Sequence, residues 1–159
     1  EWTYISCWHA NEFESAAMWD FYAKTNEAVA IETSYDRLRN VLPERVFLGC
    51  VRYIDYDTDW LPEGNTFYPF MHKRKSFEHE REVRALIQDI DSTVGKLEVG
   101  KANNQSGQLV PIEVNGLISA IHVAPTSPYW LVDLVAEVAS KYEVSAGVRR
   151  SDLYSEPVF

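Results

Sequence analysis

The sequence lacks the features that mark a disulfide-rich secreted domain or a membrane-spanning protein. Its 159 residues include only two cysteines, Cys7 and Cys50, and neither belongs to a Cys-x-x-Cys pair. Two thiols cannot form a disulfide framework, so we expect a reducing, cytoplasmic setting. No apolar run approaches the roughly eighteen residues of a membrane span, so we expect no contact with a membrane.

The motifs of several common enzyme classes are also missing. The sequence contains no glycine-rich phosphate loop, no Gly-x-Ser-x-Gly elbow and no His-Glu-x-x-His helix, which excludes the usual NTPase, dinucleotide-fold, serine-hydrolase and zinc-protease classes. Residues 55–59 begin like a calcium loop, but Trp60 replaces the required glycine and Thr66 the bidentate glutamate. The histidines do not show metal-ligand spacing, so we predict no metal site; they are His9, His72, His79 and His122.

Charge and length narrow the class of protein further. The net charge is −9 and the isoelectric point is about 4.9, so non-specific binding to nucleic acid is disfavoured. We expect a single domain over residues 1–159, because the chain is too short for two domains of ordinary size. Since the chain opens at Glu1-Trp2 without an initiator methionine, we also expect it to lack an N-terminal segment.

Apolar periodicity predicts an α+β fold, with a mixed, mostly antiparallel sheet of about six strands and two or three covering helices. The first half of Val46–Ile54 is apolar on both faces, which favours a central position in the sheet. Asn115-Gly116 between two apolar runs predicts a β-hairpin. Helices are expected at residues 12–24, at residues 34–41, and for about four turns from Ser127-Pro128.

The predicted helix at residues 12–24 is apolar over most of its circumference. Met18, Trp19 and Tyr22 share one face at helical spacing, and Phe21 lies on a neighbouring face. A helix of this kind is buried or forms one wall of a pocket. Core packing is the commoner explanation of the two, because large aromatic side chains dominate protein cores.

The segment Lys73–Arg84 is the part of the chain richest in ionisable side chains. If it ends in a strand, alternation places Glu80, Glu82 and Arg84 on one face. Neighbouring carboxylates repel each other, so one pKa rises unless a cation such as Arg84 intervenes. This arrangement suits the stabilisation of a cationic transition state, such as an oxocarbenium ion at a ribose. The alternative is an exposed strand face whose charges neutralise one another.

Two other groups of residues point to other functions. The basic run Lys73–Lys75 suits contact with an anionic ligand or partner. Cys7 and His9 lie two apart on a predicted strand and therefore share a face, as a thiol nucleophile and its base would. Against this, a buried cysteine more often behaves as a small hydrophobic residue.

Three segments in this order resemble a known family. They are Ser6-Cys7-Trp8-His9 with Glu14–Tyr22, then Val29-Ala30-Ile31, and then Lys73-Arg74 with Phe77–Arg84. The pattern is similar to that of a mainly bacterial family of unknown function, numbered 2971. Residues 118–125, the helix containing Trp130 and residues 148–153 fit the end of the family's pattern. The resemblance covers nearly the whole chain and implies that a further N-terminal segment usually precedes it.

A second, more distant similarity concerns mechanism. A strand bearing a glutamate, then a strand, a helix and a closing strand, resembles the C-terminal half of ADP-ribosyltransferase-like folds. The resemblance implies NAD as the substrate, with Glu82 or Glu80 as the catalytic glutamate at the nicotinamide ribose. Candidate substrate-binding residues are Arg84, Lys73, Arg74, His9, Trp19 and Tyr22.

Two functional hypotheses follow from the sequence. A third, a metal nuclease using Glu80, Glu82 and an aspartate from residues 55–59, is disfavoured, because Arg84 stands where the catalytic lysine is needed and cannot act as a general base. The first is an ADP-ribosyltransferase-like or NAD-consuming domain of a bacterial defence or toxin system, acting on a small-molecule or nucleotide substrate. The alternative is a non-catalytic ligand- or protein-binding module whose basic run Lys73–Lys75 meets an anionic partner. A concave pocket that Glu80 and Glu82 face alongside His9, Trp19 and Tyr22 would favour the first hypothesis, and exposure of both carboxylates to solvent would favour the second.

Overall fold

A computed structural model describes residues 3–88 and 106–156, and these residues form the predicted α+β fold. The chain divides into two compact units, each built from two segments. The first unit comprises Glu1–Asn11 and Pro43–Val110, and the second comprises Glu12–Leu42 and Pro111–Phe159. The single domain expected from the chain length stays a prediction.

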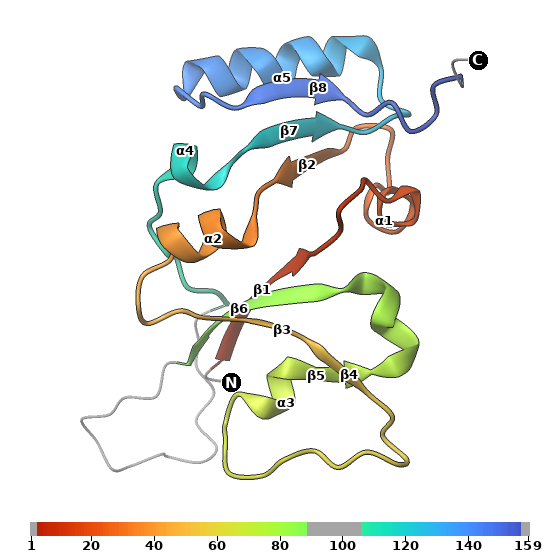
Figure 1. Cartoon of the computed structure of the whole chain (residues 1–159). Helices are drawn as coiled ribbons and strands as arrows, with labels where there is room; N and C mark the ends of the chain where they lie inside the picture. The colour runs from red at the N-terminus through yellow and green to blue at the C-terminus, as the bar shows by residue number, and fades with distance from the viewer. Residues whose placement is uncertain (1–2, 89–105, 157–159) are drawn as a thin grey trace. The chain divides into compact units, whose positions relative to one another are not determined.

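The first unit contains a three-stranded antiparallel sheet in the order β1-β6-β3, which Figure 1 shows in red, green and orange. β6 is buried on both faces, since Val83, Ala85, Leu86 and Ile87 belong to the core. The central position predicted for residues 46–54 is therefore wrong, because β3 lies at the edge of this sheet. The strands are β1 (Thr3–His9), β3 (Phe47–Cys50) and β6 (Glu82–Gln88).

The strand predicted at residues 46–54 is divided at Val51, whose backbone N–H donates to the carbonyl oxygen of Glu82 at 2.8 Å. Beyond this point the chain forms a separate parallel pair of β4 and β5. Gly49 allows close packing beside the sheet, because a Cβ atom there would lie 2.9 Å from the Met71 methyl group. The elements of this region are β4 (Arg52–Ile54), α3 (Tyr68–Met71), β5 (His72–Arg74) and the 3₁₀ helix η1 (Lys75–Glu80).

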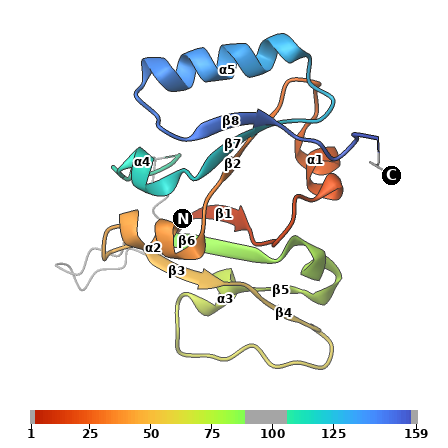
Figure 2. The same ribbon diagram turned by 45° about the horizontal axis from the view of Figure 1, so that its top comes forward.

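The second unit contains a sheet in the order β2-β7-β8, antiparallel between β2 and β7 and parallel between β7 and β8. Figures 1 and 2 show α5 lying along this sheet. Ile121 and Val123 on the sheet are buried, as are Leu131 and Ala139 on the helix. None of the helices in the described residues is long and apolar enough to cross a membrane. The elements are β2 (Val29–Glu32), β7 (Ala120–Val123), α5 (Tyr129–Lys141) and β8 (Gly147–Arg150).

The helix α1 (Ala16–Tyr22) is shorter and more exposed than the sequence predicts. It begins after Ser15, whose backbone is extended, and none of its residues is buried. Phe21 and Tyr22 are 56% and 73% exposed. The prediction of a buried helix is therefore wrong, since apolar character around a helix does not ensure that other elements cover it.

The hairpin predicted at Asn115-Gly116 is also wrong. These residues lie in the short helix α4 (Val114–Leu117), which packs beside α2 (Tyr35–Val41). The Asn115 carboxamide accepts from the backbone N–H and the hydroxyl of Ser145 at 2.8 and 3.0 Å, and it donates to the Glu143 carbonyl at 3.0 Å. These long-range hydrogen bonds replace the local turn that Asn-Gly favours in a hairpin.

We expect Asn115→Ala to lower the free energy of unfolding by about 1–2 kcal/mol, because the variant loses the three hydrogen bonds that join α4 to the turn after α5. Urea denaturation followed by circular dichroism measures the change. Asn40→Ala, at an exposed position of α2, is the control and should change stability by less than about 0.5 kcal/mol. Equal stability of the two variants would contradict the role assigned to Asn115.

Candidate functional site

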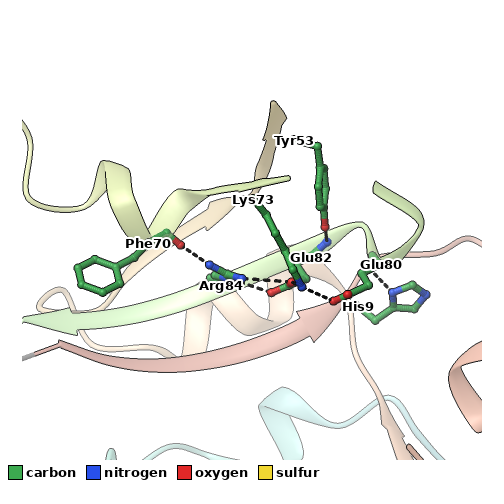
Figure 3. A network of polar contacts seen from close by, with 7 residues as sticks. All are labelled: His9, Tyr53, Phe70, Lys73, Glu80, Glu82 and Arg84. Atoms are coloured by element: carbon green, nitrogen blue, oxygen red, sulfur yellow. Dashed lines mark hydrogen bonds and ion pairs between the residues drawn. The ribbon is translucent and has the colours of Figure 1, made fainter. Parts of the chain in front are cut away.

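Glu82, the first residue of β6, lies at the centre of a network of charged side chains in the first unit (Figure 3). Its carboxylate accepts a hydrogen bond from the Lys73 ammonium at 2.6 Å, and Arg84 binds both of its oxygens at 2.7 and 3.2 Å. Lys73 also donates to the Glu80 carboxylate at 2.7 Å. One ammonium therefore joins the two carboxylates, and the four side chains balance their charges.

Backbone and tyrosine contacts fix this network in the first unit. The Glu82 backbone N–H donates to the Tyr53 hydroxyl at 2.8 Å, and Arg84 donates to the Phe70 carbonyl at 2.6 Å. Tyr53 lies on β4, Phe70 on α3 and Lys73 on β5. The network thus ties the β4–β5 pair and α3 to the central strand of the sheet.

The structure corrects the position predicted for Glu80. This residue ends the 3₁₀ helix η1, and Arg81 follows in the left-handed conformation, with φ of 42° and ψ of 53°. The strand begins only at Glu82, so alternation along one strand does not place Glu80 beside Glu82. The carboxylates meet because Lys73, on another strand, lies between them.

The Glu82 carboxyl is held in its ionised form. Its side chain is only 7% exposed, and this burial alone would raise its pKa. Hydrogen bonds from Arg84 and Lys73 outweigh the effect of burial and lower the pKa to about 2. Repulsion between carboxylates does not raise the pKa of Glu82, because the cations Lys73 and Arg84 lie beside it.

The basic run Lys73–Lys75 does not act as one exposed cluster. Burial would lower the pKa of Lys73, but hydrogen bonds to Glu80 and Glu82 outweigh it and raise the pKa. The guanidinium of Arg74 lies over the Tyr56 ring, 4.6 Å from its centre. An anionic partner would therefore meet Arg74 and the exposed Lys75 more readily than Lys73, whose ammonium is paired.

The contacts of Cys7 and His9 do not favour a thiol nucleophile. Strand register places Cys7 opposite Arg84 and His9 opposite Glu82. Cys7 is an exposed residue, yet partial desolvation of its thiol and a hydrogen bond with Glu82 raise the pKa of that group, whereas a nucleophile requires the thiolate. The Nδ1 atom of His9 contacts the backbone carbonyl of Glu80 rather than the thiol.

An open hollow of about 560 Å³ lies at the start of β6 in the first unit. Its volume falls in the range of small-molecule sites. The lining combines apolar, aromatic and charged residues, and it includes Glu82 but not Glu80: Ala10, Cys50, Val51, Tyr53, Glu78, His79, Arg81, Glu82 and Val83.

Five of the eight predicted site residues come together in the network or contact it: Glu82, Glu80, Arg84, Lys73 and His9. Arg74 is directed at Tyr56, and Trp19 and Tyr22 belong to the second unit. Sequence reasoning missed Tyr53, although it lies within a predicted strand. Among the described residues, no group of three His, Cys, Asp or Glu side chains is arranged to hold a metal ion.

A second polar cluster, also missed from the sequence, lies in the second unit. The Nε2 atom of buried His122 lies 2.7 Å from the Glu32 carboxylate, which also accepts from Arg149 at 3.1 Å. The hydrogen bond with His122 is the main cause that lowers the pKa of Glu32. Strand alternation explains the cluster, since β2, β7 and β8 each contribute one of these side chains.

Comparison with known proteins does not assign the chain to a family. No family model, curated protein or solved structure matches it. The resemblance to the family numbered 2971, and the more distant similarity to ADP-ribosyltransferase-like folds, thus stay predictions from the sequence motifs.

The low pKa of Glu82 predicts a specific dependence of stability on pH. Because the folded-state pKa lies below the unfolded-state value near 4.5, the contribution is complete above that pH and is lost as the pH falls towards 2. The shift corresponds to about 3 kcal/mol, since one pKa unit is about 1.4 kcal/mol. Urea denaturation between pH 2.5 and 7 should therefore show a steeper loss of stability on acidification in wild type than in Glu82→Gln.

Two further measurements make this prediction specific. Glu82→Gln should cost about 3 kcal/mol at pH 7, because it removes the central partner of Lys73 and Arg84. Glu78→Gln, at an exposed position of η1, should retain both the stability and the pH dependence of wild type. Parallel pH profiles for wild type and Glu82→Gln would show that the carboxylate is not held by the cations.

Proposed function

We propose that this chain supplies the carboxylates of an NAD-consuming or ADP-ribosyl-transferring site, in a bacterial protein of a defence or toxin system. The observation that carries the proposal is a buried, ionised Glu82 that is among the residues lining an open hollow. A second carboxylate, that of Glu80, is bound to the same ammonium. The resemblance of the sequence to ADP-ribosyltransferase-like folds supplies the substrate class.

The chemistry requires a carboxylate that keeps its charge. Cleavage of the bond between nicotinamide and ribose develops positive charge on the ribose, and a preorganised anion lowers the energy of that transition state. With a pKa near 2, Glu82 is ionised throughout the physiological range. It is too weak a base to remove protons at neutral pH, so the role proposed for it is electrostatic.

The two carboxylates differ in their capacity to accept a further hydrogen bond. Both oxygens of Glu82 already bind Arg84, and one also binds Lys73. Glu80 binds Lys73 through one oxygen, so its other oxygen retains acceptor capacity for a ribose hydroxyl. We therefore assign to Glu82 the role of the carboxylate that keeps its charge. The variants described below test both residues for contact with the ribose.

The alternative function, a non-catalytic module that binds an anionic partner, has less support. It depends on the run Lys73–Lys75, and the ammonium of Lys73 is already paired with two carboxylates. Arg74 and Lys75 remain for such a contact, and exposed charges of this kind contribute little individually.

We expect the protein to release nicotinamide from NAD, as measured by chromatography of the reaction mixture. Glu82→Gln and Glu80→Gln should each reduce the release at least about 100-fold, because removal of one electrostatic contact to a transition state has effects of this size. Glu44→Gln is the control, since Glu44 is exposed in the first unit and does not belong to the lining of the hollow, and it should retain wild-type release.

Folding of each variant is checked separately by the thermal midpoint. At a temperature where Glu82→Gln is still folded, loss of release reports on chemistry rather than on stability. The proposal is wrong if wild type neither releases nicotinamide nor shows a higher thermal midpoint with NAD. Salt-sensitive binding of an anionic partner that survives both glutamine substitutions would instead favour the binding module.

A further inference from the structure

We infer that Tyr53 and Arg81 form a phosphate-binding subsite in the hollow of the first unit, for the diphosphate of a nucleotide ligand. Both residues line the hollow, together with Glu82. The subsite adds a binding role to the proposed function, and the identification of the whole ligand as a dinucleotide rests on that function. The subsite itself depends only on these two side chains and is testable with inorganic pyrophosphate.

The Tyr53 hydroxyl is arranged as a hydrogen-bond donor. Its oxygen accepts the backbone N–H of Glu82 at 2.8 Å (Figure 3), and this contact does not use the hydroxyl proton. Within residues 3–88 and 106–156, the hydroxyl donates this proton to no other group. Burial, the largest effect, raises the pKa of Tyr53, so the hydroxyl keeps its proton and has it available for a ligand oxygen.

Arg81 occupies a backbone position that an arginine side chain does not favour. Its left-handed conformation is needed to end η1 and to begin β6: its N–H donates to the Glu78 carbonyl at 3.2 Å, and its carbonyl accepts the Ala10 N–H at 3.0 Å. Glycine would adopt this conformation at lower cost. The turn therefore requires the backbone of Arg81 but not its guanidinium group.

The guanidinium of Arg81 is an exposed cation at the wall of the hollow. It forms no ion pair among the described residues. Of the carboxylates in the lining, Glu82 is already neutralised by Lys73 and Arg84, which leaves Glu78 as the opposing charge. An arginine with this freedom binds two phosphate oxygens at once, a geometry that a lysine does not reproduce.

The subsite also fits the chemistry proposed for the carboxylates. A dinucleotide such as NAD carries two bridged phosphates next to its riboses. Donors at Tyr53 and Arg81 would hold those phosphates in the same hollow that Glu82 lines. Binding energy from a non-reacting part of the substrate is what positions the reacting bond.

Calorimetric titration of the full chain with inorganic pyrophosphate tests the subsite. Wild type should bind, and the affinity should fall with increasing salt. Arg81→Gly and Tyr53→Phe should each lower the affinity at least about tenfold, because each removes a donor to a charged group. Arg81→Gly keeps the backbone conformation, so its thermal midpoint should not fall. Arg45→Gln, at an exposed position of the first unit, should bind as wild type does.

The outcomes separate the subsite from the proposed function. Absence of pyrophosphate binding in wild type, or equal affinity in wild type, Arg81→Gly and Tyr53→Phe, overturns the subsite. Nicotinamide release that Arg81→Gly leaves unchanged, in KM as well as kcat, overturns it too, while the proposed function stands. Pyrophosphate binding that depends on Arg81, in a protein that releases no nicotinamide, supports the subsite and rejects the proposed function.

Discussion

The first unit depends on the ionised carboxylate of Glu82 between two cations. Burial of this charge is costly, and the hydrogen bonds from Lys73 and Arg84 offset the cost only while all three groups are in place. Lys73 comes from β5, whereas Glu82 and Arg84 belong to β6. The same contact therefore decides the charge of the site and the attachment of the β4–β5 pair to the sheet.

This dual role sets a constraint on any chemistry at the site. Cations that keep Glu82 ionised also occupy its oxygens, so a ligand hydroxyl must compete with them or use Glu80. The charges of the network balance, so it carries no net negative charge. A cationic transition state is therefore stabilised only if its orientation and its distance from the carboxylates are suitable. A substrate held by its phosphates would supply both.

The sequence carried enough information for the fold class and for the charged site, but not for how each element is placed. Alternating apolar residues identified β6, and the charges before it marked the network. Glu80 was misplaced because the left-handed Arg81 interrupts the strand, and a non-glycine residue gives no local signal of that conformation. The hairpin failed because the partners of Asn115 are about thirty residues away, beyond the reach of any local turn preference.

The pairing of early strands with late ones has a consequence for synthesis of the chain. β1 pairs with β6, and β2 pairs with β7, so the first strand of each three-stranded sheet is made long before its partner. Closing such long loops is slow compared with local helix formation. During synthesis, β1 and β2 therefore precede their partners with unpaired backbone groups, and unpaired strand edges of this kind favour aggregation.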